Sequence, residues 1–142
     1  MRGLGAAALV LLMLLGVAPA GGGQDLSAVY PSEQAFAAAT AGLRQRAQEN
    51  PRDPDVRYRL GLAYFSVWRQ FEAGLVPYGR GYDRAAEAEF RAALQAAPGH
   101  LGSLLALYSL LRLRGQWEEA EALLRSIVRA ALPPSATGGA AR

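Results

Sequence analysis

Apolar residues recur at intervals of three and four along most of this chain, which is the spacing of one face of an α-helix. Leu104, Leu107 and Leu111 show this spacing in one stretch, and prolines such as Pro51 and Pro98 separate such stretches. The strong helix formers Ala, Leu, Arg, Glu and Gln dominate the composition, whereas strand formers are scarce. An all-α fold is therefore expected, with helices at about 32–49, 54–73, 83–97, 101–114 and 117–131.

The first twenty residues have a different pattern. Arg2 supplies one positive charge, an apolar run extends from residue 6 to residue 18, and Ala18-Pro19-Ala20 has the small-x-small form that a signal peptidase cleaves. The run is shorter than the roughly 20 apolar residues that a membrane-spanning helix needs. We therefore predict that 1–20 is a cleaved signal peptide.

This prediction means that the protein is exported to the periplasm or the extracellular space, with no stable membrane insertion after cleavage. Glycines follow the cleavage site, and the chain ends in a stretch rich in Pro, Ser, Thr and Gly. Such compositions favour flexible chain. The expected organisation is a flexible linker over 21–31, a helical domain over 32–132 and a disordered tail over 133–142.

The helical region contains an internal repeat. The stretch that begins at Gly81 aligns without a gap with the stretch that begins at Gly115, 34 residues later. Small residues match at Ala86 and Ala120. A period of 34 residues with two helices per period is typical of one class of helical repeat.

The residues within this period resemble the tetratricopeptide-repeat (TPR) family pattern. The matching positions are Leu60, Gly61, Tyr64, Gly81, Ala86, Phe90, Ala93 and Pro98. The resemblance covers about 32–132 and implies a TPR-like α-solenoid of antiparallel helix hairpins with about two and a half repeats. Gly61 and Ala86 are then expected to face each other where the two helices of the first hairpin cross.

The first hairpin departs from the family pattern in length. The segment between Tyr64 and Gly81 is about 13 residues longer than in the family. No helix breaker occurs in it before Gly74 and Pro77. We expect the first helix of this hairpin to continue for two or three turns, so that the first hairpin is extended.

Charge and candidate chemistry argue against several classes of function. The net charge of +3 comes from dispersed basic residues, which does not predict a nucleic-acid surface. The chain has no Cys, and its only His, His100, is interpreted as a solvated surface residue. Acidic groups such as Glu87 and Glu118 are interpreted as charges near helix N-termini. We predict no catalytic site, no cofactor and no metal.

The TPR resemblance implies a concave groove lined by the first helix of each hairpin. Carried onto this sequence, the partner-binding positions are Asp55, Tyr58, Arg59, Leu62, Phe65, Leu105, Ser109 and Arg112, together with Leu113. Arg and aromatic side chains are good anchors for a peptide. Alternatively, the arginines belong only to the solvated face of an amphipathic helix.

The extended part of the first hairpin carries an aromatic group that consists of Trp68, Phe71 and Tyr78. Trp68 and Phe71 are three residues apart and share a helix face. Either the returning segment 75–80 covers these side chains, or they form an exposed interface. We expect coverage, with one aromatic residue left over.

The last helix has no following repeat against which to pack. We expect Trp117, Ala120, Leu124, Ile127 and Val128 to serve the hairpin, and Leu123 to lack an internal partner. This predicts a docking surface or a weak homodimer at Leu123. The leading hypothesis is an exported, non-catalytic adaptor for a protein or peptide. The alternatives are a self-associating structural protein of the envelope and, third, an accessory subunit of an enzyme.

Overall fold

The computed structural model describes residues 28–132, and within that range every regular element is a helix. The all-α prediction is confirmed, and no helix boundary differs from the expected one by more than one residue. The helices are α2 (Glu33–Glu49), α3 (Pro54–Glu72), α4 (Tyr82–Ala96), α5 (Leu101–Leu113) and α6 (Trp117–Ala131). The predicted signal peptide 1–20, the tail 133–142 and most of the linker 21–31 lie outside the described residues.

Local chemistry explains where these helices begin. The Asp53 carboxylate accepts hydrogen bonds from the backbone N–H groups of Asp55, at 3.0 Å, and Val56, at 3.1 Å. Pro54 follows as the first residue of α3, a position that does not require an N–H donor. Gly81 and Gly115, which precede the two helices that close the hairpins, have φ angles of 80° and 74°. Glycine reaches these left-handed conformations without a steric penalty.

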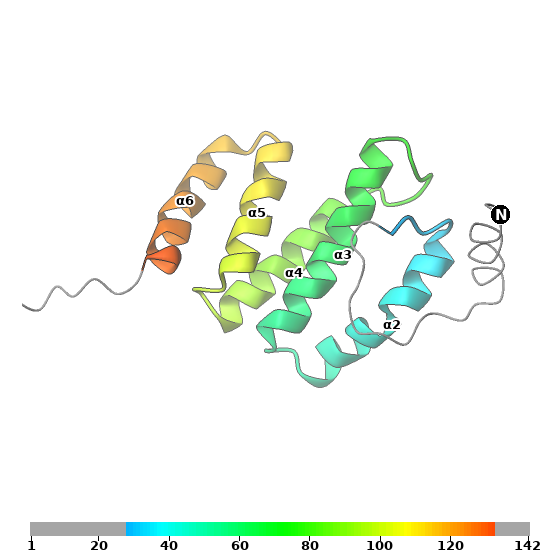
Figure 1. Ribbon diagram of the computed structural model, residues 1–142, viewed down its shortest axis with the longest axis horizontal. Helices are drawn as coiled ribbons and strands as arrows, with labels where there is room; N and C mark the ends of the chain where they lie inside the picture. The colour runs from blue at the N-terminus through cyan, green and yellow to red at the C-terminus, as the bar shows by residue number, and fades with distance from the viewer. Residues whose placement is uncertain (1–27, 133–142) are drawn as a thin grey trace, which may run out of the picture.

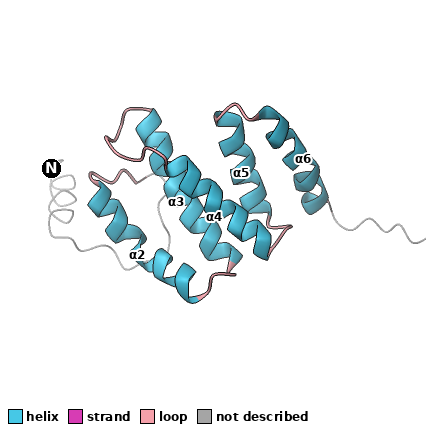
Figure 2. Cartoon of the chain, turned by 180° about the vertical axis from the view of Figure 1, so that it is seen from behind, coloured by secondary structure: helices cyan, strands magenta, loops and turns pink. Residues whose placement is uncertain are grey.

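The helices stand in a row along the long axis of the molecule (Figure 1). α3 and α4 pack along each other, α5 continues the row, and α6 packs along α5 at the end. Seen from behind, α4 lies in front of α3 (Figure 2), so α3 and α4 belong to opposite faces of the molecule. α2 packs on α3 at the other end of the row.

The interior consists of three adjoining clusters rather than one centre. The largest joins α4, α5 and α6 through Phe90, Leu107 and Ala120, all of which are buried. The second joins α2, α3 and the loop before α4, and the third joins α2 and α3. Tyr64 contacts all three clusters, which places it at the centre of the packing.

The extended part of the first hairpin is helical through Glu72, as expected. The chain then returns through a loop in which Val76 is buried against α2 and α3. Gly79 has a φ of 110° and lies so close to α3 that a Cβ there would come within 3.0 Å of Val67. The returning segment therefore packs directly on the extra turns of α3.

Two expectations about packing need correction. The three heavy atoms nearest to a Cβ at Gly61 all belong to Phe90, so the residue closest to Gly61 is Phe90, where Ala86 was expected. The end of the predicted linker also packs against the helices. Tyr30 contacts Phe36, with ring centroids 5.6 Å apart, and its carbonyl accepts a hydrogen bond from the Tyr78 hydroxyl at 2.9 Å.

Candidate functional site

The predicted partner-binding residues lie on α3 and α5, which are neighbours in the row. Tyr58 fills the junction between these two helices. A Cβ at Gly102 would come within 2.9 Å of its ring, and its centroid lies 5.2 Å from that of His100. Tyr58 therefore packs between helices, while its remaining surface contributes to the face that α3 and α5 share.

The other predicted positions differ in what they offer to a partner. Leu62 and Phe65 are half-buried against the largest cluster. The Ser109 hydroxyl donates to the backbone carbonyl of Leu105 at 2.9 Å, so it is already engaged. The exposed members are Asp55, Arg59, Leu105, Ser109 and Arg112, and the adjacent Leu113 is exposed as well.

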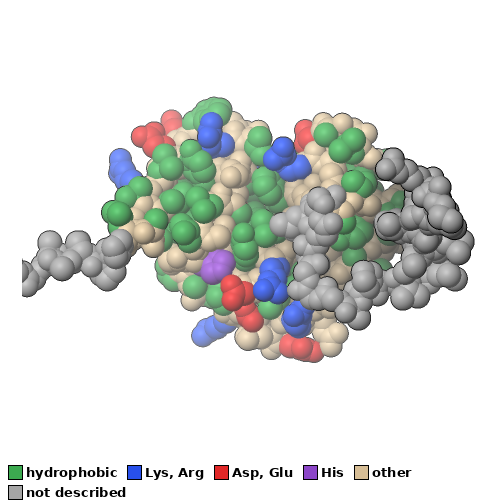
Figure 3. Space-filling view, in the orientation of Figure 1, with side chains coloured by type: hydrophobic (Ala, Val, Ile, Leu, Met, Phe, Trp, Pro, Cys, Tyr) green, Lys and Arg blue, Asp and Glu red, His purple; other side chains and the backbone are tan. Residues whose placement is uncertain are grey.

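The exposed residues of α5 recur at intervals of three and four and so form one continuous face of the helix. In the space-filling view, hydrophobic side chains gather over α5 and α6, with basic side chains beside them (Figure 3). Hydrophobic and basic side chains are thus both exposed on this side. We call Arg59, Leu105, Arg112 and Leu113 the front strip.

Arg112 is held by aromatic side chains. Its guanidinium carbon lies 5.6 Å from the ring centroid of Tyr108 and 5.6 Å from that of Trp117. Cation–π contacts at this distance hold a guanidinium in place without neutralising its charge. Among residues 28–132, neither Arg112 nor Arg59 forms an ion pair with a carboxylate. Both charges are therefore available to a ligand.

The aromatic residues of the extension do not form the exposed interface that was considered. Phe71 on α3 and Tyr78 on the returning segment both pack against the cluster that contains Val76, so neither forms an exposed patch. Trp68 packs against the largest cluster and stacks on Phe65, with centroids 6.0 Å apart. All three aromatic side chains are half-buried because the loop and the neighbouring helices reach them.

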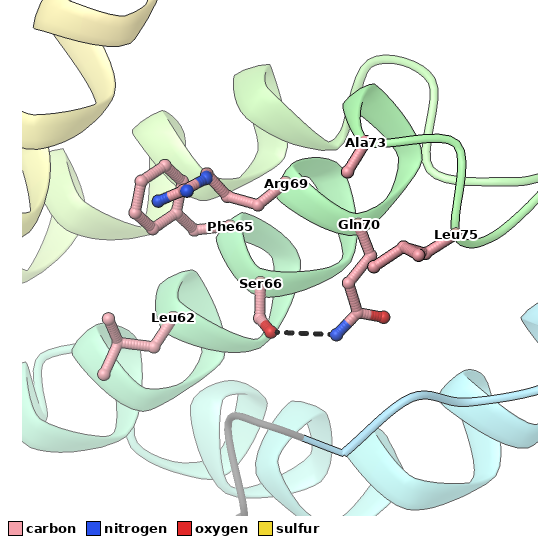
Figure 4. Close-up of a pocket in the computed structure, with 7 residues that line it drawn as sticks. All are labelled: Leu62, Phe65, Ser66, Arg69, Gln70, Ala73 and Leu75. Carbon is pink, nitrogen blue, oxygen red and sulfur yellow. Dashed lines mark hydrogen bonds between the residues drawn. The ribbon is translucent and has the colours of Figure 1, made fainter.

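An open hollow of about 480 Å³ lies beside the extra turns of α3. Figure 4 shows its lining, in which the Gln70 amide points to Ser66 and Arg69 extends towards Phe65. Gln70 Nε2 donates to Ser66 Oγ at 3.4 Å and to the carbonyl of Ala28 at 3.2 Å. The walls are mostly apolar with one guanidinium, which is not a set of metal-ligating groups.

A chain of hydrogen bonds that was not foreseen joins α3 to α5. His100 Nε2 lies 3.0 Å from Asp55 Oδ1, and His100 Nδ1 lies 2.8 Å from Ser103 Oγ. Ser, His and Asp in such a chain invite comparison with a nucleophilic site. However, the Ser103 side chain is 0% exposed, so its hydroxyl cannot reach a substrate.

The same chain of hydrogen bonds has a structural explanation. His100 is the N-cap of α5, and its Nδ1 accepts a hydrogen bond from the Ser103 N–H at 3.1 Å. Its side chain is only 18% exposed, so the interpretation of His100 as a solvated residue was wrong. The spacing of His100 three residues before Ser103 could have indicated the helix cap from the sequence. The carboxylate partner of His100, Asp55, is 45 residues distant in sequence, so the sequence gives no comparable signal for that contact.

Several of the carboxylates interpreted as helix-terminus charges form ion pairs between helices. Glu87 on α4 binds Arg91 at 2.7 Å and also binds Arg114 at the end of α5. Arg91 in turn binds Glu119 on α6. Burial opposes ionisation of Glu87, but the hydrogen bonds from the two arginines outweigh it and lower its pKa. This network ties α4 to both helices of the second hairpin.

The last helix buries Ala120 and half-buries Ile127, as expected, but the other expected core positions differ. Leu123 is half-buried against the largest cluster, so it is not a free docking residue. Trp117, Leu124 and Val128, which were assigned to the hairpin core, are exposed. The reason is the direction from which α5 approaches. α5 contacts the face that carries Ala120 and Leu123 and leaves the next face open.

No group of three or more His, Asp or Glu side chains able to hold a metal ion occurs in the part of the chain that the structure describes. None of the helices from α2 to α6 has both the length and the apolar character needed to cross a membrane. Comparisons of the chain with known protein families, with curated proteins and with solved structures find no match.

Proposed function

We propose that this chain is an exported TPR-like adaptor that binds a partner protein or peptide and performs no catalysis of its own. The 34-residue repeat and its family-like residues support about two and a half repeats in a solenoid with an extended first hairpin. The succession of helix hairpins in a row is compatible with that arrangement. Function in such a scaffold resides in the surface residues rather than in the fold.

The front strip is the observation that carries the proposal. It combines the exposed leucines Leu105 and Leu113 with two guanidinium groups, on Arg59 and Arg112, that have no carboxylate partner in the described residues. A guanidinium binds a carboxylate through two parallel hydrogen bonds. Aromatic contacts already hold Arg112 in position, which lowers the entropy lost on binding. The chemistry that fits is a peptide segment with carboxylate groups between apolar side chains.

Site-specific photo-crosslinking in the native cell tests this proposal. A photoreactive residue at Leu105 should capture one partner, whereas the same residue at the exposed Ala88 of α4 should not. Arg112→Glu should reduce the capture at Leu105 because it opposes a carboxylate with another negative charge. Arg84→Glu, at an exposed position of α4, is the matched control. Equal capture from both positions, or an unchanged yield with Arg112→Glu, contradicts the proposal.

Export is a separate part of the proposal, with its own measurement. The small residues Ala18 and Ala20 support cleavage after Ala20. The intact mass of the protein recovered outside the cytoplasm should correspond to a chain that begins at Gly21. Recovery of the chain from the membrane with residues 1–20 still attached rules out this part.

A further inference from the structure

One exposed apolar stripe follows the outer side of α6. It consists of Trp117, Leu124 and Val128, whose exposed fractions are 60%, 40% and 55%. Their intervals of seven and four residues place them on one face of the helix. This face is distinct from the one that carries Ala120 and Leu123, which packs against α5. We call these three residues the α6 stripe.

The charges beside the stripe change sign along the helix. Glu118 and Glu121 lie in its first half, and Arg125 and Arg129 lie in its second half. All four side chains are exposed, and none forms an ion pair with another described residue. The outer side of α6 is therefore acidic near its N-terminus and basic near its C-terminus.

We propose that α6 is a homodimer interface in which the helices of two copies lie antiparallel and cross at the level of Leu123. In that register Glu121 of one copy lies opposite Arg125 of the other. Glu118 comes within one residue of Arg129, and Trp117 comes within one residue of Val128. One alignment thus brings the apolar residues and the opposite charges together at the same time. It has the two-fold symmetry expected of an interface between identical chains, with the two copies of Leu124 on either side of the axis.

The charge pattern also selects the orientation. A parallel pair would set Glu118 against Glu118 and Arg129 against Arg129, and such like-charge contacts are unfavourable. The contact is small because a helix of 15 residues is only about 22 Å long. An interface of this size buries less than the ~1,200 Å² of stable complexes. The dissociation constant of the dimer should therefore lie between about 1 µM and 1 mM.

Sedimentation equilibrium measures the association directly, on the chain as the cell processes it. We expect a monomer–dimer equilibrium between about 1 µM and 1 mM, the range of weak interfaces. Leu124→Glu should weaken the dimer at least tenfold, because it places two carboxylates on either side of the axis, where an apolar side chain was. Leu75→Glu, at an exposed leucine of the loop before α4, is the control and should leave association unchanged. A wild-type chain that stays monomeric throughout, or a Leu124→Glu variant that dimerises normally, overturns the proposal.

Charge exchange tests the register. Glu118→Arg and Arg129→Glu should each weaken the dimer, because each creates like-charge contacts. The double variant should restore it, and an equimolar mixture of the two single variants should form heterodimers. Both substitutions oppose the helix dipole, so circular dichroism should show similar or greater fraying in the double variant. Rescue therefore cannot come from helix stability, and its absence contradicts the antiparallel register.

The α6 stripe and the front strip meet where Arg112 lies over the ring of Trp117, so the two proposals are separated with residues away from that contact. Leu124→Glu should leave photo-crosslinking from Leu105 unchanged, whereas Arg59→Glu, on α3, should leave sedimentation unchanged. If Leu124→Glu leaves sedimentation unchanged but abolishes photo-crosslinking from Leu105 while the fold is intact, the stripe binds the partner protein and not a second copy. That outcome overturns the homodimer.

Discussion

The ring of Phe90 lies directly against the backbone of Gly61. A Cβ added at Gly61 would come within 2.6 Å of Phe90 Cε1 and within 2.7 Å of Cδ1. Phe90 is fully buried in the cluster that joins α4, α5 and α6, so its ring cannot move aside. This contact connects α3 with the helix behind it and with the second hairpin.

Gly61→Ala should therefore destabilise the protein, although alanine is the better helix former. Overpacking of a filled core costs about 1–3 kcal/mol. Gly42→Ala in α2 is the matched control, because no atom lies within 4 Å of a Cβ there. The control should gain about 0.5–1 kcal/mol from helix propensity. Urea denaturation measures both, and a Gly61→Ala variant as stable as the control contradicts the packing of Phe90 on Gly61.

Acid should weaken the network around Glu87. Its pKa in the folded chain is lower than its ordinary value of 4.5, because Arg91 and Arg114 bind the carboxylate. A group with a depressed folded pKa contributes its full stability above the unfolded pKa and loses it as the pH falls through the folded pKa. Stability should therefore fall below about pH 4.5.

Glu87→Gln separates this contribution from those of other carboxylates. At pH 7 the variant should lose about 1–2 kcal/mol, the contribution of hydrogen bonds to a charged group. Its stability should also decline less steeply with acid than that of the wild type. Thermal melts at several pH values give both quantities, and parallel pH profiles for the two proteins argue against the role of Glu87.

His100→Ala should lower the free energy of unfolding by about 1–3 kcal/mol. One part of this loss comes from removal of the helix cap. The other part comes from the buried Ser103 hydroxyl, which loses its hydrogen-bond partner. His100→Asn should recover the capping part, since Asn is a good N-cap residue. Asp55→Asn should change stability by no more than about 0.5 kcal/mol, because Asp55 is exposed. Chemical denaturation ranks the three variants, and equal losses for Ala and Asn exclude the capping role.

Truncation of two adjacent leucines on α6 should affect the free energy of unfolding to different extents. Leu123→Ala should destabilise by about 1–2 kcal/mol because Leu123 packs against the largest cluster. Leu124→Ala should stay within about 0.5 kcal/mol of the wild type because its side chain lies on the open face. The measurement must be made at low concentration, where dimers are absent. The reverse order of losses identifies Leu124 as the core residue.

The residue pattern was sufficient to predict the five helices and their boundaries. Helix formation depends on local propensity, on caps such as Asp53 and on breakers such as Pro98, and all of these act within a few residues. The buried positions of α4 were implied by the resemblance to the TPR pattern. Ala86, Phe90 and Ala93 recur at helical spacing, and the structure buries all three.

Contacts between helices were predicted less well. Gly61 was paired with Ala86 instead of Phe90, because spacing along a helix does not set the height at which its partner crosses. Tyr30 was assigned to a linker, although its contacts come from Phe36 and Tyr78. His100 was assigned to the solvent for the same reason, since its partner Asp55 comes from α3.

The sequence by itself therefore determined that this chain forms helices, where each begins and ends, and which residues of α4 face inward. Only the tertiary structure decided which side of α6 is covered. Leu123 and Leu124 differ by about 100° around the helix, and either was a reasonable core residue from spacing alone. The position of α5 against α6 packed Leu123 against the core, where it is half-buried, and left Leu124 exposed. That position results from packing among several helices, which no local stretch of sequence specifies.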